Sequence, residues 1–252
     1  MKILTFIKPI KTELLYANEC DGEKFSVNPY DAKVIVNLSA FKNCQAMELI
    51  VAAMGSSASE CVLRKALASG MDSAYLLCDN AFAGADTVAT SYVLEKAAVR
   101  IGADAVFMGQ YAVDGETGQT PFGVAERLGY RCVSGVEELR EIGNRTLTLK
   151  VNVPNGYRIV KVGIPTVVVF SGMTTKKSTY SLLEMKRAKA KRITVLSSHD
   201  ISADEEFCGI KGSRTRVMNI TGDLIKKSGE KIELLPSEAV ERVLSLLRDS
   251  NV

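Results

Sequence analysis

The chain has 252 residues, 46% of them apolar, which is enough to bury a sizeable core in one large domain or two small ones. Its 32 Lys and Arg residues barely exceed its 29 Asp and Glu residues, and a formal net charge of +3 does not indicate a nucleic-acid partner. The apolar N-terminus is too short for a secretory signal, and no apolar run approaches the ~20 residues of a membrane span, so we expect a cytoplasmic protein.

Short apolar runs alternate with helical patterns through the first half of the chain. This alternation is typical of a parallel sheet wound by crossover helices. Glycines at positions 70 and 102 follow two of the helical patterns and are expected to end those helices. We expect strands at residues 3–7, 47–54, 74–78 and 105–109, and helices at 56–69, 85–100 and 122–128.

The pattern changes after Tyr130. Residues 139–164 alternate apolar and polar side chains around the turn signals Gly143-Asn144 and Asn155-Gly156, which predicts antiparallel hairpins. Residues 166–170 again have the composition of a buried strand. The basic run 186–192 and the polar run 197–212 indicate an arm rather than a core, and residues 237–247 are expected to form a final helix.

The loop that follows the strand at 105–109 is rich in glycine and leads into a helix. We expect Thr120 to cap that helix and Pro121 to occupy its first position, which leaves the amides of Phe122 and Gly123 free to attract a phosphate. Two carboxylates of this loop would repel a phosphate if they faced it. Asp114 is therefore expected to accept from a ribose hydroxyl or from amides of its own Asp-Gly turn, with Glu116 towards solvent.

Two further loops follow expected parallel strands, at residues 7–9 and 53–56. Open α/β sheets bind ligands at this edge, although a strand-to-helix turn needs Gly and Ser even where no ligand binds. A metal centre is not expected, because the six cysteines form no C-x-x-C pair and the single histidine, His199, lies in a loop-like sequence.

Several motifs, taken together and in their order along the sequence, resemble the β subunits of electron transfer flavoproteins, and the resemblance extends over nearly the whole chain. Two late segments, 186–193 and 208–217, resemble the basic segment of that family and a motif of its bifurcating and nitrogen-fixation-linked branch. The earlier motifs are Asn28-Pro29-Tyr30-Asp31, Leu63-Arg64-Lys65-Ala66-Leu67-Ala68, Gly84-Ala85-Asp86-Thr87 and Asp114-Gly115-Glu116-Thr117-Gly118-Gln119.

The resemblance implies an α/β fold of the adenine-nucleotide α-hydrolase-like (Rossmann-like) type, with the antiparallel hairpins and a C-terminal arm added. It implies a nucleotide- or flavin-binding domain at residues 1–195, and an arm and helix at 196–252 that contact a larger FAD-carrying α subunit. No residue is then expected to be catalytic, since the chemistry belongs to the flavin. The implied cofactor-binding residues are Phe6, Ile7, Lys8, Asn28, Pro29, Tyr30, Asp31, Met54, Gly55, Val113, Asp114, Gly115, Glu116, Thr117, Gly118, Gln119 and Thr120.

Within this resemblance the site holds either AMP or a second FAD. The 114–119 loop lacks the extra residues of AMP-holding mitochondrial members, and it occurs together with the Gly212-Ser213-x-Thr215-Arg216-Val217 motif, so we favour FAD, with NADH as a possible electron donor in flavin-based bifurcation. Residues 174–180 depart from the usual partner-recognition sequence. The resemblance implies a partner dehydrogenase, such as an acyl-CoA dehydrogenase, and this departure indicates that the partner is an unusual one.

Apolar residues beside the basic run suit a small, transient interface with that dehydrogenase. The expected contacts are Tyr180, Leu182, Leu183 and Met185. Leu182, Leu183 and Met185 could instead form one buried helix face. An adenine-nucleotide-binding sensor or stress-type protein without a redox role is the alternative function, because the same fold type can hold ATP.

Overall fold

The computed structural model describes residues 1–15, 25–42, 47–174, 180–216, 218 and 232–249. Internal contacts divide the chain into two units, Met1–Arg216 and Val217–Val252. This division falls after Arg216, whereas the boundary that we expect from the sequence lies after residue 195. The difference arises because residues 197–216 make side-chain hydrogen bonds to the first unit.

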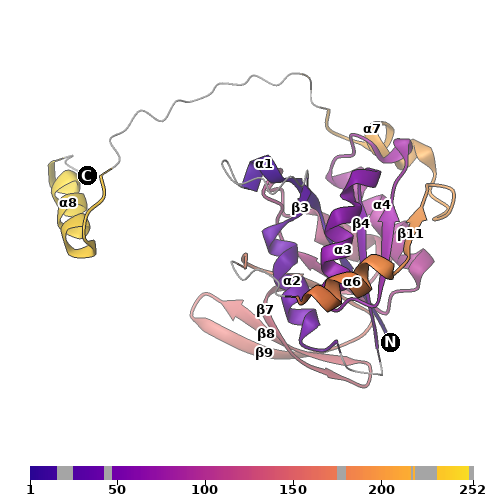
Figure 1. Cartoon of the computed structure of the whole chain (residues 1–252), viewed down its shortest axis with the longest axis horizontal. Coiled ribbons are helices and arrows are strands. Elements are labelled where there is room, and N and C mark those ends of the chain that lie inside the picture. The colour runs from indigo at the N-terminus through magenta and orange to yellow at the C-terminus, as the bar shows by residue number, and fades with distance from the viewer. Residues whose placement is uncertain (16–24, 43–46, 175–179, 217, 219–231, 250–252) are drawn as a thin grey trace. The chain divides into compact units, whose positions relative to one another are not determined.

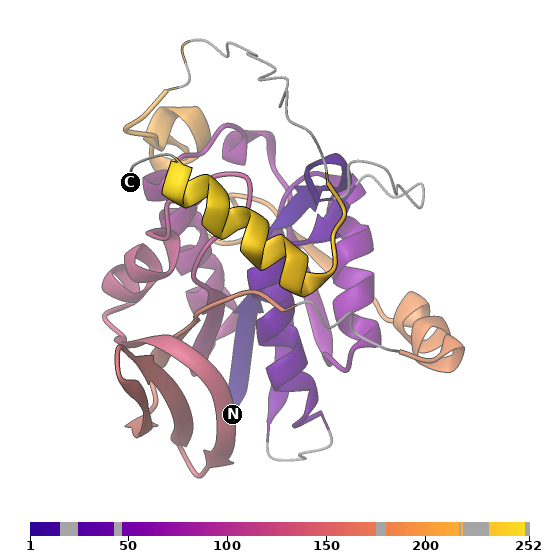
Figure 2. The same ribbon diagram turned by 90° about the vertical axis from the view of Figure 1, so that its left-hand side faces the viewer.

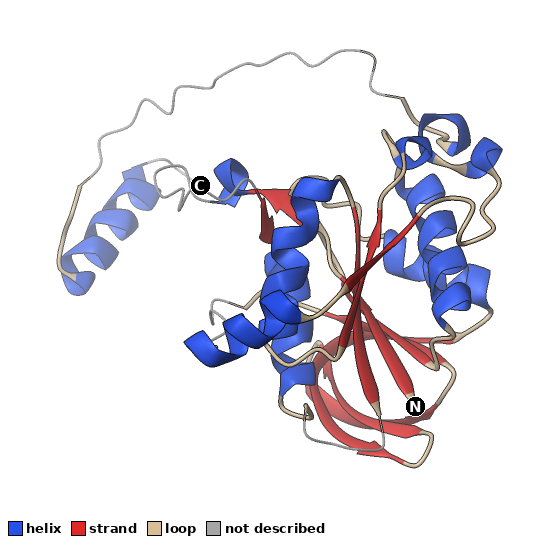
Figure 3. Ribbon diagram, turned by 45° about the vertical axis from the view of Figure 1, so that its right-hand side comes forward, coloured by secondary structure: helices blue, strands red, loops and turns tan. Residues whose placement is uncertain are grey.

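A nine-stranded sheet organises the first unit, in the order β11-β5-β4-β1-β6-β10-β7-β8-β9 (Figures 1 and 3). Every pairing from β11 to β7 is parallel, and β8 and β9 continue the sheet as an antiparallel meander. The parallel strands are β1 (Lys2–Phe6), β4 (Glu48–Met54), β5 (Ser73–Leu77), β6 (Ala105–Gly109), β7 (Arg131–Gly143), β10 (Thr166–Phe170) and β11 (Ile193–Leu196). The predicted parallel α/β fold and its strands are thus confirmed.

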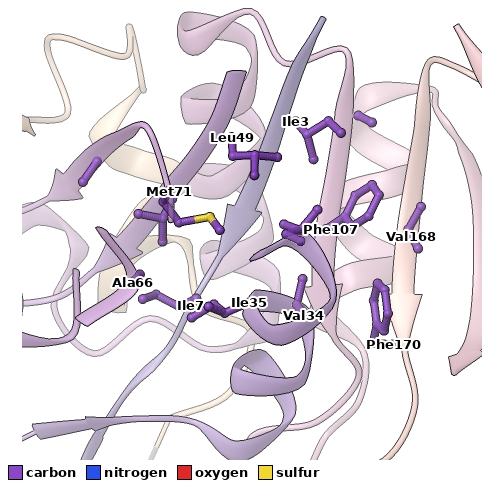
Figure 4. Packing of buried hydrophobic residues seen from close by; sticks show 14 of the residues in the cluster. Ile3, Ile7, Val34, Ile35, Leu49, Ala66, Met71, Phe107, Val168 and Phe170 are labelled. Carbon is purple, nitrogen blue, oxygen red and sulfur yellow. The ribbon is translucent and has the colours of Figure 1, made fainter. Parts of the chain in front are cut away.

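Helices cover both faces of the parallel sheet (Figure 3). Buried side chains of α2 (Pro29–Ser39), α3 (Glu60–Ala68) and α6 (Leu182–Ala190) belong to one apolar cluster, part of which Figure 4 shows around Leu49 and Phe107. Those of α4 (Thr87–Ile101) and α5 (Thr120–Leu128) belong to a second cluster on the other face. The central strands β4, β6 and β10 are covered on both sides and are accordingly made mostly of apolar residues.

Local sequence explains where the long helices begin and end. The carboxylate of Asp86 caps α4 by accepting from the amides of Val88 and Ala89, and Gly102 ends it in the left-handed conformation at φ 73°. The expectation of a helix from residue 56 is modified, since a short 3-10 helix, η1 (Ser57–Ser59), precedes α3. Helix α2 lies outside our predictions altogether, although Pro29 opens it.

The meander is made of β7, β8 (Thr146–Val153) and β9 (Gly156–Gly163), with turns at 144–145 and 154–155. The hairpins predicted at 139–164 are therefore confirmed. Leu139, Leu147 and Leu149 are buried in the same cluster as α2 and α3, so the meander extends the core beyond the parallel strands. Figure 2 shows it at one end of the sheet, next to the start of β1.

Residues 181–216 are integrated into the first unit, which corrects the expectation of an arm. Strand β11 pairs with β5 at the edge of the sheet, and Ile201 and Cys208 are buried. A 3-10 helix, η3 (Glu205–Phe207), and the short helix α7 (Gly209–Gly212) follow. The remaining short elements are β2 (Pro9–Lys11), which pairs with β3 (Phe25–Val27), α1 (Thr12–Leu15) and η2 (Asn80–Phe82).

The second unit contains α8 (Pro236–Asp249), as expected from residues 237–247. Its apolar residues Val240, Val243, Leu244 and Leu247 are each about half exposed and recur at helical spacing, so they line one face. Among the described residues, none of the helices has the length and apolar composition needed to cross a membrane.

Candidate nucleotide site

The expected site loops follow three neighbouring strands. Strand β1 lies between β4 and β6, and all three run parallel, so the loops after Phe6, Met54 and Gly109 leave the sheet at the same edge. The strand order changes direction at β1, because β4 and β5 are added on one side of it and β6 and β10 on the other. Open α/β proteins bind ligands at such a point. The backbone links the first two loops through the sheet, since the Ile7 amide donates to the Ala52 carbonyl at 2.9 Å.

Asp31, in the first turn of α2, ties two of these loops together. Its Oδ2 accepts from the Lys8 amide at 2.8 Å, and its Oδ1 accepts from the Gly109 amide at 3.2 Å. Only 5% of the residue is exposed. Burial raises the pKa of Asp31 to about 6, against the hydrogen bonds from the Lys8 amide, the Asn28 side chain and the Gly109 amide, which lower it. The carboxylate therefore acts on the loops through their backbones.

Asn28 extends this network at the start of α2. Its Nδ2 donates to Asp31 Oδ2 at 3.1 Å and to the Tyr111 carbonyl at 2.8 Å, and its backbone amide donates to the Lys8 carbonyl at 3.2 Å. These two acceptors fix the amide orientation. Its Oδ1 is buried without a hydrogen-bond donor in the described part of the chain, so one acceptor is left for a donor that the described residues do not supply.

The loop at residues 110–119 contacts the segment that follows β1. Lys8 Nζ and Asp114 Oδ1 form an ion pair at 2.7 Å, and their side chains are 49% and 29% exposed. Gly118 is buried at φ +63°, and a Cβ there would lie 2.6 Å from the Tyr111 ring. The ring of Tyr111 in turn lies 5.5 Å from that of Tyr30. Asp114 thus has a partner that the sequence did not predict, whereas Glu116 is exposed as expected.

The start of α5 differs in detail from the prediction. Thr120 lies within the helix rather than capping it, and Gln119 stands at the cap position without a side-chain capping bond. The Gly123 amide is not free, because it donates to the Gln119 carbonyl at 3.0 Å. For the amides of Thr120 and Phe122, no acceptor occurs among the described residues, so this helix start retains donors and a positive dipole end that suit an anion.

The remaining residues that we predict for the nucleotide site lie around this edge, but they differ in which groups are available to a ligand. Phe6 and Ile7 are buried in the core, so only their backbones are available to a ligand. Gly55 follows β4, and a Cβ at this position would lie 2.5 Å from Ser59 Oγ and 3.5 Å from Pro9 Cγ. The segments brought together at this edge are 6–8, 28–31, 54–55 and 113–120.

Gly109 and Tyr111 belong to this network and are absent from our predicted set. A Cβ at Gly109 would lie 2.6 Å from Asp31 Oδ1 and 2.7 Å from Tyr30 Cβ, so only glycine lets α2 approach β6 this closely. A glycine at the end of a buried strand was the available signal. Tyr111 gave none, since its carbonyl and its ring contribute through partners distant in the sequence.

The expected dehydrogenase-contact residues separate into two pairs. Leu182 is 92% exposed and Leu183 is 56% exposed, whereas Tyr180 and Met185 are partly buried against the core. Ser181 and Glu184 form a capping box that fixes the start of α6. The preceding residues 175–179, which carry part of the unusual recognition sequence, lie outside the described residues.

Arg64 of α3 fastens the other end of α6. Its Nη1 donates to the carbonyls of Ala188, at 2.8 Å, and of Lys189 and Lys191. Its Nε donates to Glu60 Oε1 at 2.9 Å. These carbonyls lie at the C-terminus of α6, where a helix leaves acceptors exposed and a cation is favoured; the Ala188 carbonyl also accepts from the Lys191 amide at 3.3 Å. Figures 1 and 2 show α6 on the outside of the helical layer, so Arg64 anchors an exposed helix.

Comparison with known proteins finds one family that matches most of the chain and several similar relatives. The family described as "Electron transfer flavoprotein domain" matches residues 20–201. The chain is 31% identical to electron transfer flavoprotein subunit beta of Clostridium acetobutylicum over 245 residues, which cover 97% of this chain and 93% of the relative. It is 31% identical to protein FixA of Bradyrhizobium diazoefficiens, covering 77% and 70%, and 30% identical to the caffeyl-CoA reductase-Etf complex subunit CarD of Acetobacterium woodii, covering 92% and 89%.

Proposed function

This chain belongs to the electron transfer flavoprotein family, among its β subunits, and from that premise we propose that it holds an adenine nucleotide in a heterodimer that passes electrons between partner proteins. One observation carries the nucleotide proposal. Asp31 joins the loops after β1 and β6 next to the uncapped start of α5, which places Lys8 and free helix amides on the same edge of the sheet.

The residues at this edge fit a phosphorylated nucleotide. The amides of Thr120 and Phe122 and the Lys8 ammonium would bind its phosphates, and the Asn28 Oδ1 would accept from one of its N–H or O–H groups. The Lys8–Asp114 ion pair is solvent-exposed and therefore weak, so a phosphate could replace Asp114 as the partner of Lys8. We favour FAD over AMP for the reasons of loop length and motif given above, and a bound flavin would supply the redox chemistry.

The larger subunit is proposed to bind the C-terminal residues. Helix α8 presents Val240, Val243, Leu244 and Leu247 on one face, and each is about half exposed. An amphipathic helix with a contiguous apolar face gains stability by burying that face against a partner. We therefore propose that residues 217–252, and with them part of the expected arm 196–252, contact the FAD-carrying α subunit.

The dehydrogenase is proposed to dock on α6. Leu182 and Leu183 project from a helix whose other exposed residues are mainly basic, so they suit a small interface with electrostatic steering towards an acidic partner. One relative is named a subunit of a caffeyl-CoA reductase-Etf complex, which supports a partner that acts on a CoA ester, such as an acyl-CoA dehydrogenase. NADH as electron donor, bifurcation of its electrons and a cytoplasmic location belong to the same proposal.

The decisive experiment is to co-express the chain with its larger subunit, release the bound nucleotides and count them by mass spectrometry. Two FAD per heterodimer would support a flavin in this chain, and one FAD with one AMP would support the AMP alternative. A larger subunit with FAD beside a small chain that carries no nucleotide would refute the site. A colourless protein that retains ATP would indicate the sensor-type function instead.

A further inference from the structure

Asp86 connects the start of α4 to residues at the end of the first unit, which lie far away in sequence. Its Oδ1 accepts from the Val88 and Ala89 amides, at 2.9 and 3.0 Å, and so caps α4. Its Oδ2 accepts from the Arg214 amide at 2.7 Å and from the amide and hydroxyl of Thr215, at 2.9 and 3.1 Å. One carboxylate therefore receives five hydrogen bonds, three of them from residues at the end of the first unit.

Ser213 completes the attachment from the other direction. The Asp86 amide donates to Ser213 Oγ at 2.8 Å, and Ser213 Oγ donates to the Gly209 carbonyl at 2.7 Å. Burial opposes the ionisation of Asp86, but the amide hydrogen bonds outweigh it and hold the pKa of this carboxyl below its usual range. Residues 213–216, which we call the root, lead directly into the second unit, which begins at Val217.

The same helix start adjoins the nucleotide loop. Thr87, the first residue of α4, places its hydroxyl 3.4 Å from the hydroxyl of Thr117. One helical turn further on, Ser91 lies so close to α5 that a Cβ at Gly123 would be 2.9 Å from its side chain. The N-terminal parts of α4 and α5 therefore pack against each other, and Thr87 and Ser91 provide a contiguous route from the 113–120 loop to Asp86.

We infer that Asp86 is a positioning residue that couples the nucleotide loop to the root of the C-terminal unit. A nucleotide that orders the loop and the start of α5 stabilises the first turn of α4, and this in turn favours the attached root. By thermodynamic reciprocity, a partner that holds the C-terminal unit and its root in place strengthens nucleotide binding by the same factor. The coupling rests on the proposed nucleotide site, whereas the attachment of the root to Asp86 does not.

An Asp86→Asn exchange separates the two roles of the carboxylate. Asparagine caps helices as well as aspartate does, so its oxygen can keep the Val88 and Ala89 amides. Its Nδ2 is a donor and would face the donors of Arg214 and Thr215, which releases the root. Asp79→Asn is the matched control, because Asp79 caps η2 in a similar way and holds Ser198, at 2.9 and 2.7 Å, but does not touch the root.

The test is amide hydrogen exchange, followed by mass spectrometry, on the full chain in its complex with the larger subunit, after removal of nucleotide and after addition of AMP or FAD. We expect Asp86→Asn to speed exchange at residues 213–216 about tenfold, which corresponds to about 1.4 kcal/mol, and Asp79→Asn to leave it unchanged. Added nucleotide should slow this exchange at least threefold in the parent and in Asp79→Asn, but not in Asp86→Asn.

Equilibrium dialysis of AMP and FAD on the same samples distinguishes the possible failures. A nucleotide that binds the parent without slowing exchange at 213–216 would overturn the coupling and leave the proposed site intact. Absence of binding would refute the site and the coupling together, while the effect of Asp86→Asn on the root would still be measured. If Asp86→Asn does not fold, Thr215→Val removes one of the three root bonds, and unchanged exchange in that variant would overturn the attachment.

Discussion

Replacing Asp31 by asparagine is expected to weaken nucleotide binding while changing the free energy of unfolding little. Asparagine has the shape of aspartate but only one acceptor oxygen. It can serve either the Lys8 amide or the Gly109 amide, and its Nδ2 must face the other donor. One of the two loops at the carboxyl edge of the sheet is then released.

The stability change follows from two opposing terms. The pKa of Asp31 is raised from 3.8 to about 6, so at pH 8 the ionised carboxyl costs the folded state about 3 kcal/mol, at 1.36 kcal/mol for each pH unit. Asparagine removes that cost but leaves one buried amide without an acceptor, which costs ~1–3 kcal/mol. The two terms nearly cancel, so we expect the melting temperature to change by no more than about 5 °C.

The pH dependence provides a sharper readout because stability and binding respond in opposite directions. The folded state binds the proton of Asp31 more tightly than the unfolded chain does, so this group adds stability as the pH falls from above 6 towards 3.8. The protonated carboxyl loses an acceptor for the loop amides, so FAD binding should weaken as the pH falls through about 6. In Asp31→Asn both effects should disappear.

FAD titrations from pH 5 to 8, with thermal melts at each pH, measure both quantities for parent and variant. FAD is the suitable ligand because its pyrophosphate does not titrate in this range. A variant that melts more than about 10 °C lower and binds FAD with the affinity of the parent would refute the reasoning, since Asp31 would then be a structural carboxylate without an effect on the site.

Three further predictions concern the loop, the docking helix and the C-terminal unit. Gly118→Ala should weaken nucleotide retention about tenfold or more, because it strains a left-handed residue and crowds Tyr111. Gly115→Ala is the control and should leave retention unchanged, since a Cβ there meets nothing within 4 Å. Equal nucleotide occupancy in the two variants would contradict this prediction. Leu183→Ala should slow electron delivery between the heterodimer and the dehydrogenase, while the free energy of unfolding stays within about 0.5 kcal/mol of the parent. Ile159→Ala changes a comparably exposed residue and should leave the transfer rate unchanged. Early melting of Leu183→Ala at the parental transfer rate would place Leu183 in the core. Deleting residues 217–252 should abolish co-purification with the larger subunit, as measured by size-exclusion chromatography with light scattering, and an intact heterodimer would exclude α8 from the interface.

The parallel core could be predicted from sequence because each of its strands has a recognisable local sequence pattern. Residues 105–109 and 166–170 are buried throughout and, apart from Thr166, carry no polar side chain, and the helix between Asp86 and Gly102 has both its start and its stop signal. Helix α2 was missed because the run from Val34 to Val36 is β-branched and favours a strand. Its burial follows helical spacing instead, with Val34, Ile35 and Leu38 on the inner face.

The site was predictable as a set of loops but not as a network. Glycines and helix starts after strands identify the loops, whereas Asp31 meets the Lys8 and Gly109 amides, 23 and 78 residues away. The segment at 197–216 was misjudged for the same reason. Ser198 bonds to Asp79 across 119 residues and Thr215 to Asp86 across 129, and no local pattern encodes such contacts.

The way in which Arg64 holds α6 has a consequence for how this protein could change partners. Arg64 bonds to main-chain carbonyls, which are the same whatever side chains the helix carries. The outward residues of α6, including Leu182 and Leu183, can therefore be exchanged without loosening the attachment. A new docking specificity is then accessible by a few surface substitutions, and a library randomised at those positions should retain its folded members in high proportion.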